Sequence, residues 1–269
     1  MISKSNKKIQ KIFSDIKSIK IQGATNIAKA AIEAYSLNPT KQTKRTLESL
    51  RPTEPMLQNS LKALESGVSE KQILNHFSQA QDLINKHIIK LIKNKDVIFT
   101  HCHSTNVIKS LIYAKNHDRN FKIYNTETRP LFQGRKTALE LSKARIKVIT
   151  FVDSAAAIAI KQSDAVFLGA DAILKNGDVI NKVGSGMFAE IAQDNKVPVY
   201  IIADSWKFTK KNLDLEQRKA GEVWDYDIPK HIKIRNPAFE KILSKNIRAI
   251  VSELGVLTPK EFVKKAGKA

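Results

Sequence analysis

One short apolar run is followed by a carboxyl side chain, an amide side chain, a lysine and a helix start that could bind an anion. The run, residues 165–168, has the length and composition of a buried strand, and Asp171 comes shortly after it. Asn181 and Lys182 follow, and the segment 184–186 (Gly-Ser-Gly) opens a helical pattern. Backbone N–H groups at the start of a helix favour anions, so this stretch could hold a phosphate beside an acid. The same spacing also fits a strand, a turn and a surface helix without any ligand.

Cys102 is the only cysteine, and it follows a second apolar run. Near a helix N-terminus its thiol would have a lowered pKa and could act as a base or nucleophile, whereas a small buried cysteine would be inert. His101 and His103 flank it, but adjacent residues of an extended chain point to opposite faces, and the sequence has no second ligand cluster. We therefore expect no metal site, and we expect His101 to point into the packing of the sheet.

Acid chemistry at Asp171 would need an enclosed carboxyl group. Small residues precede it, and desolvation there would raise its pKa, so that it could be protonated near neutral pH. Lys182 and Lys207 are surface lysines by default, but at neighbouring strand ends they would suit phosphate groups. Arg129 and Arg135 could pair with a neighbouring carboxylate or hold phosphate, and the sequence leaves both possibilities open.

The spacing of apolar residues differs between two parts of the chain, and it indicates which elements must position these residues. Residues 1–93 have apolar spacing typical of helices and no strand signal, which predicts a helical domain. Its helices are expected at 5–19, 26–35, 40–50, 56–66 and 69–92. From residue 94 to 269, short β-branched runs alternate with helical patterns. This alternation predicts an α/β domain with a parallel sheet covered by helices on both faces.

Polar clusters follow the predicted strands of this second domain. Strands are expected at 96–100, 121–125, 147–152, 165–168 and 197–203, with helices at 104–116, 134–144, 154–162 and 187–193. The clusters lie at 101–104, 126–129, 153–154, 171 and 204–207. Because ligands of such folds bind at the carboxyl ends of the strands, their co-location predicts a site there. No G-x-G-x-x-G motif is present, so we expect no dinucleotide cofactor, and the tail 231–269 is predicted to add short helices and a loose basic end.

Composition limits the classes of function. The chain has 269 residues and a formal charge of +20, a field that would attract phosphorylated ligands, RNA or acidic partners. The lysines are spread along the chain without interleaved aromatic residues, so they argue only weakly for RNA binding. No apolar run approaches the ~20 residues of a membrane span, and the N-terminal stretch lacks a secretory signal. With one cysteine no intrachain disulfide can form, and we expect a cytoplasmic protein.

Three long motifs resemble one known superfamily. They are THCHST at 100–105, TETRPLFQGRKTALEL at 126–141 and GADAILKNGDVINKVGS at 169–185. They are similar to motifs of the archaeal ribose-1,5-bisphosphate isomerases, the methylthioribose-1-phosphate isomerases and the alpha, beta and delta subunits of translation initiation factor 2B. The similarity extends from residue 21 to residue 208. It implies a helical N-terminal domain, residues 1–93, followed by a Rossmann-like domain, residues 94–269.

The resemblance also implies a set of site residues. The catalytic cysteine and aspartate of the isomerases match Cys102 and Asp171, a pair that regulatory initiation-factor subunits generally lack. The implied substrate-binding residues are Gln22, Gly23, Ala24, Thr25, Arg51, Ser104, Thr105, Asn106, Asn181, Lys182 and Lys207. Gln22 departs from the family, which usually has arginine there, so one phosphate contact loses its charge. No metal or organic cofactor is implied.

The implied activity is the conversion of ribose 1,5-bisphosphate into ribulose 1,5-bisphosphate by a homo-oligomer that is at least a dimer. An alternative is a non-catalytic subunit, similar to those of initiation factor 2B, that binds a translation factor. The positive charge and Gln22 favour this alternative slightly, whereas Cys102, Asp171 and Lys207 disfavour it. A third interpretation is methylthioribose-1-phosphate isomerase, but its substrate ends in an apolar thioether that Lys207 would serve badly.

Overall fold

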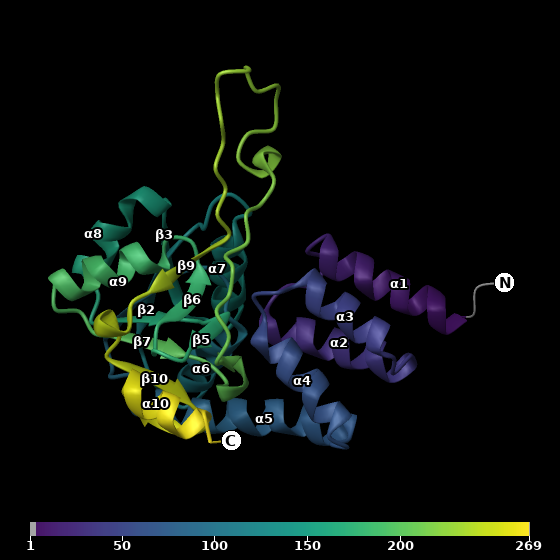
Figure 1. The fold of residues 1–269 in the computed structure, drawn as a ribbon. Helices are drawn as coiled ribbons and strands as arrows, with labels where there is room; N and C mark the ends of the chain where they lie inside the picture. Colours follow the sequence, from purple (N-terminus) through teal and green to yellow (C-terminus); the bar gives the residue numbers. More distant parts are fainter. Residues whose placement is uncertain (1–3, 269) are drawn as a thin grey trace.

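The computed structural model describes residues 4–268, and its first part is helical (Figure 1). The helices are α1 Lys4–Lys17, α2 Ala24–Leu37, α3 Lys41–Leu50, α4 Pro55–Glu65 and α5 Glu70–Ile88. Local signals explain where several of them begin. The Thr40 side chain caps α3, Pro55 opens α4, and a reciprocal pair of hydrogen bonds between Ser69 and Gln72 caps α5. The predicted helices are confirmed, although α5 ends at Ile88 rather than at residue 92.

The second part is built on a seven-stranded sheet with the order β11-β10-β7-β4-β1-β2-β3. Its strands are β1 Val97–Thr100, β2 Lys122–Thr126, β3 Lys147–Phe151, β4 Ala165–Leu168, β7 Val199–Ile202, β10 Ala249–Ser252 and β11 Gly255–Leu257. Every pairing is parallel except that of β10 with β11. The predicted α/β class with a parallel sheet is therefore confirmed.

Helices cover both faces of this sheet. They are α6 Thr105–Asn116, α7 Gln133–Lys143, α8 Ala156–Lys161, α9 Ser185–Asp194 and α10 Pro259–Ala266. On β1, Ile98 packs into a core with α5, α6 and α7, whereas its neighbour Phe99 packs into a core with α8, α9 and α10. Successive strand residues are thus buried on opposite sides, as expected for a strand inside a parallel sheet. Because α5 shares the first of these cores, it ties the helical part to the sheet.

The structure also contains a second sheet that the sequence did not predict. Its order is β8-β5-β6-β9, with β5 Ala172–Leu174, β6 Val179–Lys182, β8 Phe208–Thr209 and β9 Phe239–Ile242. The prediction for the tail is confirmed in part: residues 231–268 contain a short helix, α10, and a 3-10 turn, η4 Ser244–Asn246, but also the strands β9, β10 and β11, which were not predicted. Strands β6, β8 and β9 mix apolar with polar residues over two to four positions, so they lack the continuous apolar run that identified β4.

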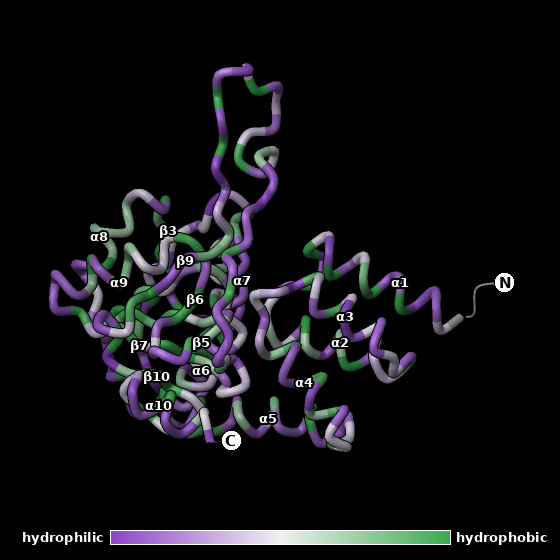
Figure 2. Tube along the Cα trace, viewed as in Figure 1, coloured by the Kyte–Doolittle hydropathy of each residue, from purple (hydrophilic) through white to green (hydrophobic). Residues whose placement is uncertain are grey.

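A long excursion, residues 210–238, joins β8 to β9 and projects away from both sheets (Figure 1). In Figure 2 it carries both hydrophilic and hydrophobic residues. Its two arms meet at the base, where Gln217 forms an isolated bridge with Pro237 and the Arg218 N–H donates to the Asn236 carbonyl oxygen at 2.8 Å. Among the described residues, no helix has the length and apolar character that crossing a membrane requires.

Candidate active site

Two adjoining cavities open at the carboxyl ends of the central strands. The strand-end cavity, about 410 Å³, lies among the residues that follow β1 and β4, and the loop-side cavity, about 710 Å³, extends towards the base of the excursion. Both are lined by Gly23, Cys102, His103 and Asp171. The two residues predicted to be catalytic therefore lie where the cavities meet.

Every predicted substrate-binding residue lines at least one of these cavities. Gly23, Ala24, Thr25, Ser104, Thr105, Asn106, Asn181 and Lys207 line the strand-end cavity. Gln22, Gly23, Arg51 and Lys182 line the loop-side cavity. The structure thus brings together residues from the helical part and from four strand ends, while their individual roles stay predictions.

The backbone around Cys102 fixes the position of the thiol. Cys102 has a left-handed conformation, with φ of 64°. Its N–H donates to the Thr128 hydroxyl at 3.0 Å, and its carbonyl oxygen accepts from the Thr137 hydroxyl at 2.6 Å. Burial raises the pKa of the Cys102 thiol to about 11, although the charge of Lys182 opposes this. The predicted lowering of this pKa was wrong, because α6 begins only at Thr105 and desolvation dominates.

The two flanking histidines are structural neighbours of the thiol. His101 is buried at 2% exposure, and its ring nitrogens contact the Thr126 hydroxyl at 2.5 Å and the Val183 carbonyl oxygen at 3.0 Å. It packs edge-on against Phe188, so the prediction that it points into the sheet packing is confirmed. Burial lowers the pKa of His101 and of His103 to about 4, so both rings are neutral near pH 7.

Asp171 is half-buried and directly follows the small residues Gly169 and Ala170. A Cβ atom on Gly169 would lie 2.5 Å from the Ser104 hydroxyl, so glycine is what allows that hydroxyl so close to the strand end. Burial raises the pKa of Asp171, while the charges of Lys207 and Lys182 oppose the rise. A protonated Asp171 could donate a proton to a bound ligand.

Lys207 is buried rather than on the surface, which corrects the default interpretation of this lysine. It lies on the 3-10 turn η2, Ser205–Lys207, is 4% exposed, and donates through Nζ to the Asn106 side-chain oxygen at 3.2 Å. Burial lowers its pKa, while the charges of Asp171 and Glu54 oppose this effect. Lys182 is half-buried, and its Nζ lies 5.2 Å from the centre of the Phe239 ring.

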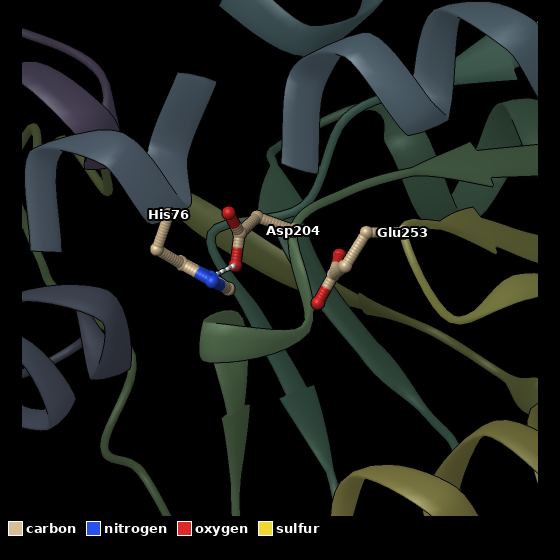
Figure 3. Close-up of side chains that lie close together, drawn as sticks. All are labelled: His76, Asp204 and Glu253. Atoms are coloured by element: carbon tan, nitrogen blue, oxygen red, sulfur yellow. Dashed lines mark hydrogen bonds and ion pairs between the residues drawn. The ribbon is translucent and has the colours of Figure 1, made fainter. Parts of the chain in front are cut away.

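A group of three side chains supports the turn that carries Lys207 (Figure 3). His76 of α5 contacts an Asp204 oxygen through Nε2 at 3.3 Å, and its ring stacks on Trp206 with centroids 4.4 Å apart. The same Asp204 oxygen accepts the Trp206 N–H at 2.8 Å, and Glu253 accepts the Ser205 N–H at 3.1 Å. Within residues 4–268 this is the one group of His, Cys, Asp or Glu side chains close enough to share a metal ion. The hydrogen bonds of these side chains account for their closeness without a metal ion, because they form a network that anchors η2.

Sequence reasoning missed Glu54. This carboxyl group is 1% exposed, lines the loop-side cavity, and accepts from Arg51 Nη2 at 3.3 Å. Burial and the charge of Asp171 raise the pKa of Glu54 to about 8, against the opposing charge of Arg51. The one feature of the sequence that could have identified Glu54 as a site residue is its position directly after the Arg-Pro-Thr segment. A glutamate before a helix-opening proline is more simply interpreted as a helix cap, although this side chain forms no cap hydrogen bond.

Three candidate anion-binding groups already have hydrogen-bond partners in the protein. In the segment 184–186, the Gly186 N–H donates to Glu240 at 2.6 Å, so this amide is not available to a phosphate. Arg135 donates to Glu127 at 2.7 Å, and Arg129 donates to the Val223 carbonyl oxygen at 3.1 Å. These two arginines line neither cavity.

Comparisons with known proteins agree with this fold. The model of the Initiation factor 2 subunit family matches residues 17–259. A ribose 1,5-bisphosphate isomerase of Methanocaldococcus jannaschii is 35% identical over 93% of this chain and 92% of its own length. A 5-deoxyribose 1-phosphate isomerase of Clostridium botulinum is 33% identical over 94% of this chain and 88% of its own.

A solved structure shares the whole architecture. The structure of a translation initiation factor eIF-2B of Pyrococcus horikoshii OT3 has a TM-score of 0.84 and 26% identity, covering 95% of this chain and 98% of that one. Fold and matches therefore define an α/β protein of a class that includes both sugar-phosphate isomerases and initiation factors. The chain belongs to the Initiation factor 2 subunit family, and the resemblance seen in its motifs is confirmed.

Proposed function

We propose that this protein is an aldose–ketose isomerase that converts ribose 1,5-bisphosphate into ribulose 1,5-bisphosphate. The observation that supports this most is the position of Cys102 and Asp171, which line both cavities at their junction. The isomerase names of relatives at 35% and 33% identity agree with it. The alternative subunit role gives no reason for placing a thiol and an enclosed carboxyl group there.

The chemistry of the substrate explains why a base and an acid are both needed. The anomeric oxygen of an aldose 1-phosphate carries the phosphate, so the ring cannot open in the ordinary way. A base must remove the proton at C2 while an acid protonates the ring oxygen, which breaks the bond between C1 and that oxygen. The resulting enol phosphate then gains a proton at C1 and loses its hydroxyl proton at C2, which gives the 2-ketose.

Cys102 and Asp171 fit these two roles. The thiolate of Cys102 takes the C2 proton, and the protonated carboxyl group of Asp171 supplies the proton for the ring oxygen. Burial keeps Asp171 protonated more readily, as an acid requires. The same burial disfavours the thiolate, and Lys182 is the neighbouring charge that favours it. Proton loss from the thiol is therefore the demanding step of this mechanism.

The strand-end cavity fits a phosphate group. Ser104 and Thr105 bring hydroxyl groups to the start of α6, and Gly23 lies at the N-cap of α2. Helix N-termini and hydroxyl donors favour phosphate, and Lys207 adds a positive charge. We assign the 5-phosphate to Lys207.

The decisive test is turnover of ribose 1,5-bisphosphate by the purified protein, followed by detection of ribulose 1,5-bisphosphate. A pull-down with initiation factor 2 belongs beside it. We expect turnover and no retained factor. Retention of the factor without turnover would establish the alternative, a translation-factor-binding subunit. The similarity to a solved eIF-2B structure at 26% identity is the reason for testing this alternative.

We further propose that the protein is a homo-oligomer, at least a dimer, located in the cytoplasm. The edge strand β3 is largely exposed, and Ile149 on it is 37% exposed. Other exposed large apolar side chains on the neighbouring chain segments are Leu139 of α7 at 66%, Val152 at 55% and Ile158 of α8 at 57%. An uncovered apolar edge of this kind suits a second copy of the chain. Light scattering at micromolar concentration tests this, and a monomer there would contradict it.

A further inference from the structure

One buried carboxyl oxygen, on a residue that lines the loop-side cavity, has no protein partner among the described residues. Glu54 is 1% exposed, and its Oε1 atom accepts from Arg51 Nη2 at 3.3 Å. Its Oε2 atom is buried and forms no hydrogen bond within residues 4–268. Buried polar atoms are almost always satisfied, so an orphaned oxygen in a cavity wall indicates a place where a ligand supplies the partner.

Two further side-chain atoms of the loop that contains Glu54 are also buried without a hydrogen-bond partner in the part of the chain that the structure describes. Residues 51–54 connect α3 to α4, and Arg51 Nε and Thr53 Oγ1 are also buried without partners among the described residues. Arg51 and Glu54 both line the loop-side cavity together with Asp171. The unsatisfied oxygen therefore belongs to a carboxyl group that borders the proposed reaction site.

The surroundings favour a hydroxyl group over a phosphate as the missing partner. Arg51, the nearest cation, already faces Glu54 and also lies 3.6 Å from a Glu216 oxygen through Nη1. A phosphate beside two carboxyl groups would meet repulsion whenever either is ionised. A hydroxyl group can donate to a carboxylate or accept from a carboxylic acid, so it satisfies Glu54 in both states. Both states are accessible near neutral pH, because the pKa of Glu54 is raised to about 8.

We propose that Glu54 is a specificity-determining residue whose Oε2 atom binds a ring hydroxyl group of the sugar. This inference rests on the proposed isomerase function. A ribofuranose with phosphates at positions 1 and 5 presents two ring hydroxyl groups, at positions 2 and 3, and Glu54 reads one of them. A site built to hydrogen-bond a hydroxyl group rejects the analogue without it, because its own buried polar atom is then left unpaired.

The test is calorimetric binding to a Cys102→Ser protein, which should not turn the ligands over. The probes are ribose 1,5-bisphosphate and its 2-deoxy and 3-deoxy analogues. We expect the loss of one of the two hydroxyl groups to weaken binding at least ~10-fold. Adding Glu54→Met, which keeps the side-chain length but forms no hydrogen bond, should reduce that difference to less than ~3-fold.

Glu54→Leu provides a second variant should the methionine destabilise the fold. Its side chain is shorter and offers neither a donor nor an acceptor. We expect the difference between parent and analogue to fall at least ~3-fold in this variant. Thermal unfolding of each variant shows whether the fold survives.

Glu216→Gln is the matched control. Glu216 lines the same cavity and also lies beside Arg51, but its Oε1 atom already accepts from Arg218 Nη1 at 2.8 Å. We expect the difference between parent and analogue to persist in this variant. Persistence of the full difference in Glu54→Met, or in Glu54→Leu if the methionine variant does not fold, would overturn the inference alone. Failure of the Cys102→Ser protein to bind ribose 1,5-bisphosphate at all would overturn the proposed function and this inference with it.

Discussion

The two cavities meet at the same pair of residues but satisfy their charges differently. In the strand-end cavity, the Lys207 ammonium group donates to a neutral partner, Asn106, and forms no ion pair within residues 4–268, although the nearby carboxyl groups of Asp171 and Glu54 favour its charge. In the loop-side cavity, Arg51 lies beside Glu54 and Glu216. Arg218 there is likewise paired with two glutamates, Glu216 and Glu222.

This difference teaches that a count of cations does not identify a phosphate site. A guanidinium group that already contacts carboxylates gains little from a further anion, because its charge is largely compensated. A buried ammonium group with a neutral partner can gain a full charge-assisted hydrogen bond. We therefore expect phosphate recognition to be strongest in the strand-end cavity and hydroxyl recognition to dominate in the loop-side cavity.

The largest effect should come from the residues that the cavities share. Cys102→Ser or Asp171→Asn should each lower turnover of ribose 1,5-bisphosphate at least ~100-fold, the usual scale for losing a general base or acid. Thermal unfolding should show that the fold survives both changes. Turnover close to that of the wild type in either variant would eliminate the proposed chemistry. This outcome does not depend on which cavity binds the 5-phosphate.

The pH dependence of turnover should report the demanding proton loss at Cys102. The pKa of this thiol is raised to about 11, so the reactive thiolate is the minor form at neutral pH. Turnover should then rise between roughly pH 7 and 9 as the thiolate fraction grows, by up to about tenfold per pH unit, and it should fall where Asp171 loses its proton. The raised pKa of Asp171 delays the loss of the acid as pH rises. A rate that is constant across this range would show that the thiolate is already formed in the complex.

Lys207→Met separates the two phosphates and directly tests the strand-end cavity. A charge-assisted hydrogen bond contributes roughly 1.5–3 kcal/mol, so the bisphosphate should bind at least ~10-fold more weakly to this variant. Ribose 1-phosphate should be affected much less, because it has no second phosphate. Calorimetry on the Cys102→Ser protein measures both ligands. Equal losses for the two sugars would mean that Lys207 does not read position 5.

Gln22→Arg should produce the smallest of these effects. The Gln22 side chain lies at the loop-side cavity and donates to the Ile19 carbonyl oxygen at 2.9 Å. It offers at most a neutral hydrogen bond, worth about 1 kcal/mol, where the family has a charged arginine. Arginine should therefore tighten bisphosphate binding a few-fold, on the order of 1 kcal/mol. Weaker binding would indicate that this edge of the cavity is not arranged for a phosphate.

Local sequence patterns determined much of the framework. The apolar run expected at 165–168 is strand β4, Ala165–Leu168, without a change of bounds. The candidate residues also line the cavities, because residues after parallel strands must emerge at one edge of the sheet. These features depend on short-range periodicity and on a general rule of topology, which the sequence contains.

Only the tertiary structure decided the electrostatics and the second sheet. The pKa of Cys102 is raised rather than lowered, Lys207 is buried, and Glu54 faces the cavity, because segments far apart in the chain enclose all three. Strand β5 has only three residues, and strand β9 mixes apolar with charged residues and pairs with β6 across some sixty residues. Desolvation and long-range strand pairing depend on tertiary contacts between distant segments, and local sequence patterns do not specify those contacts.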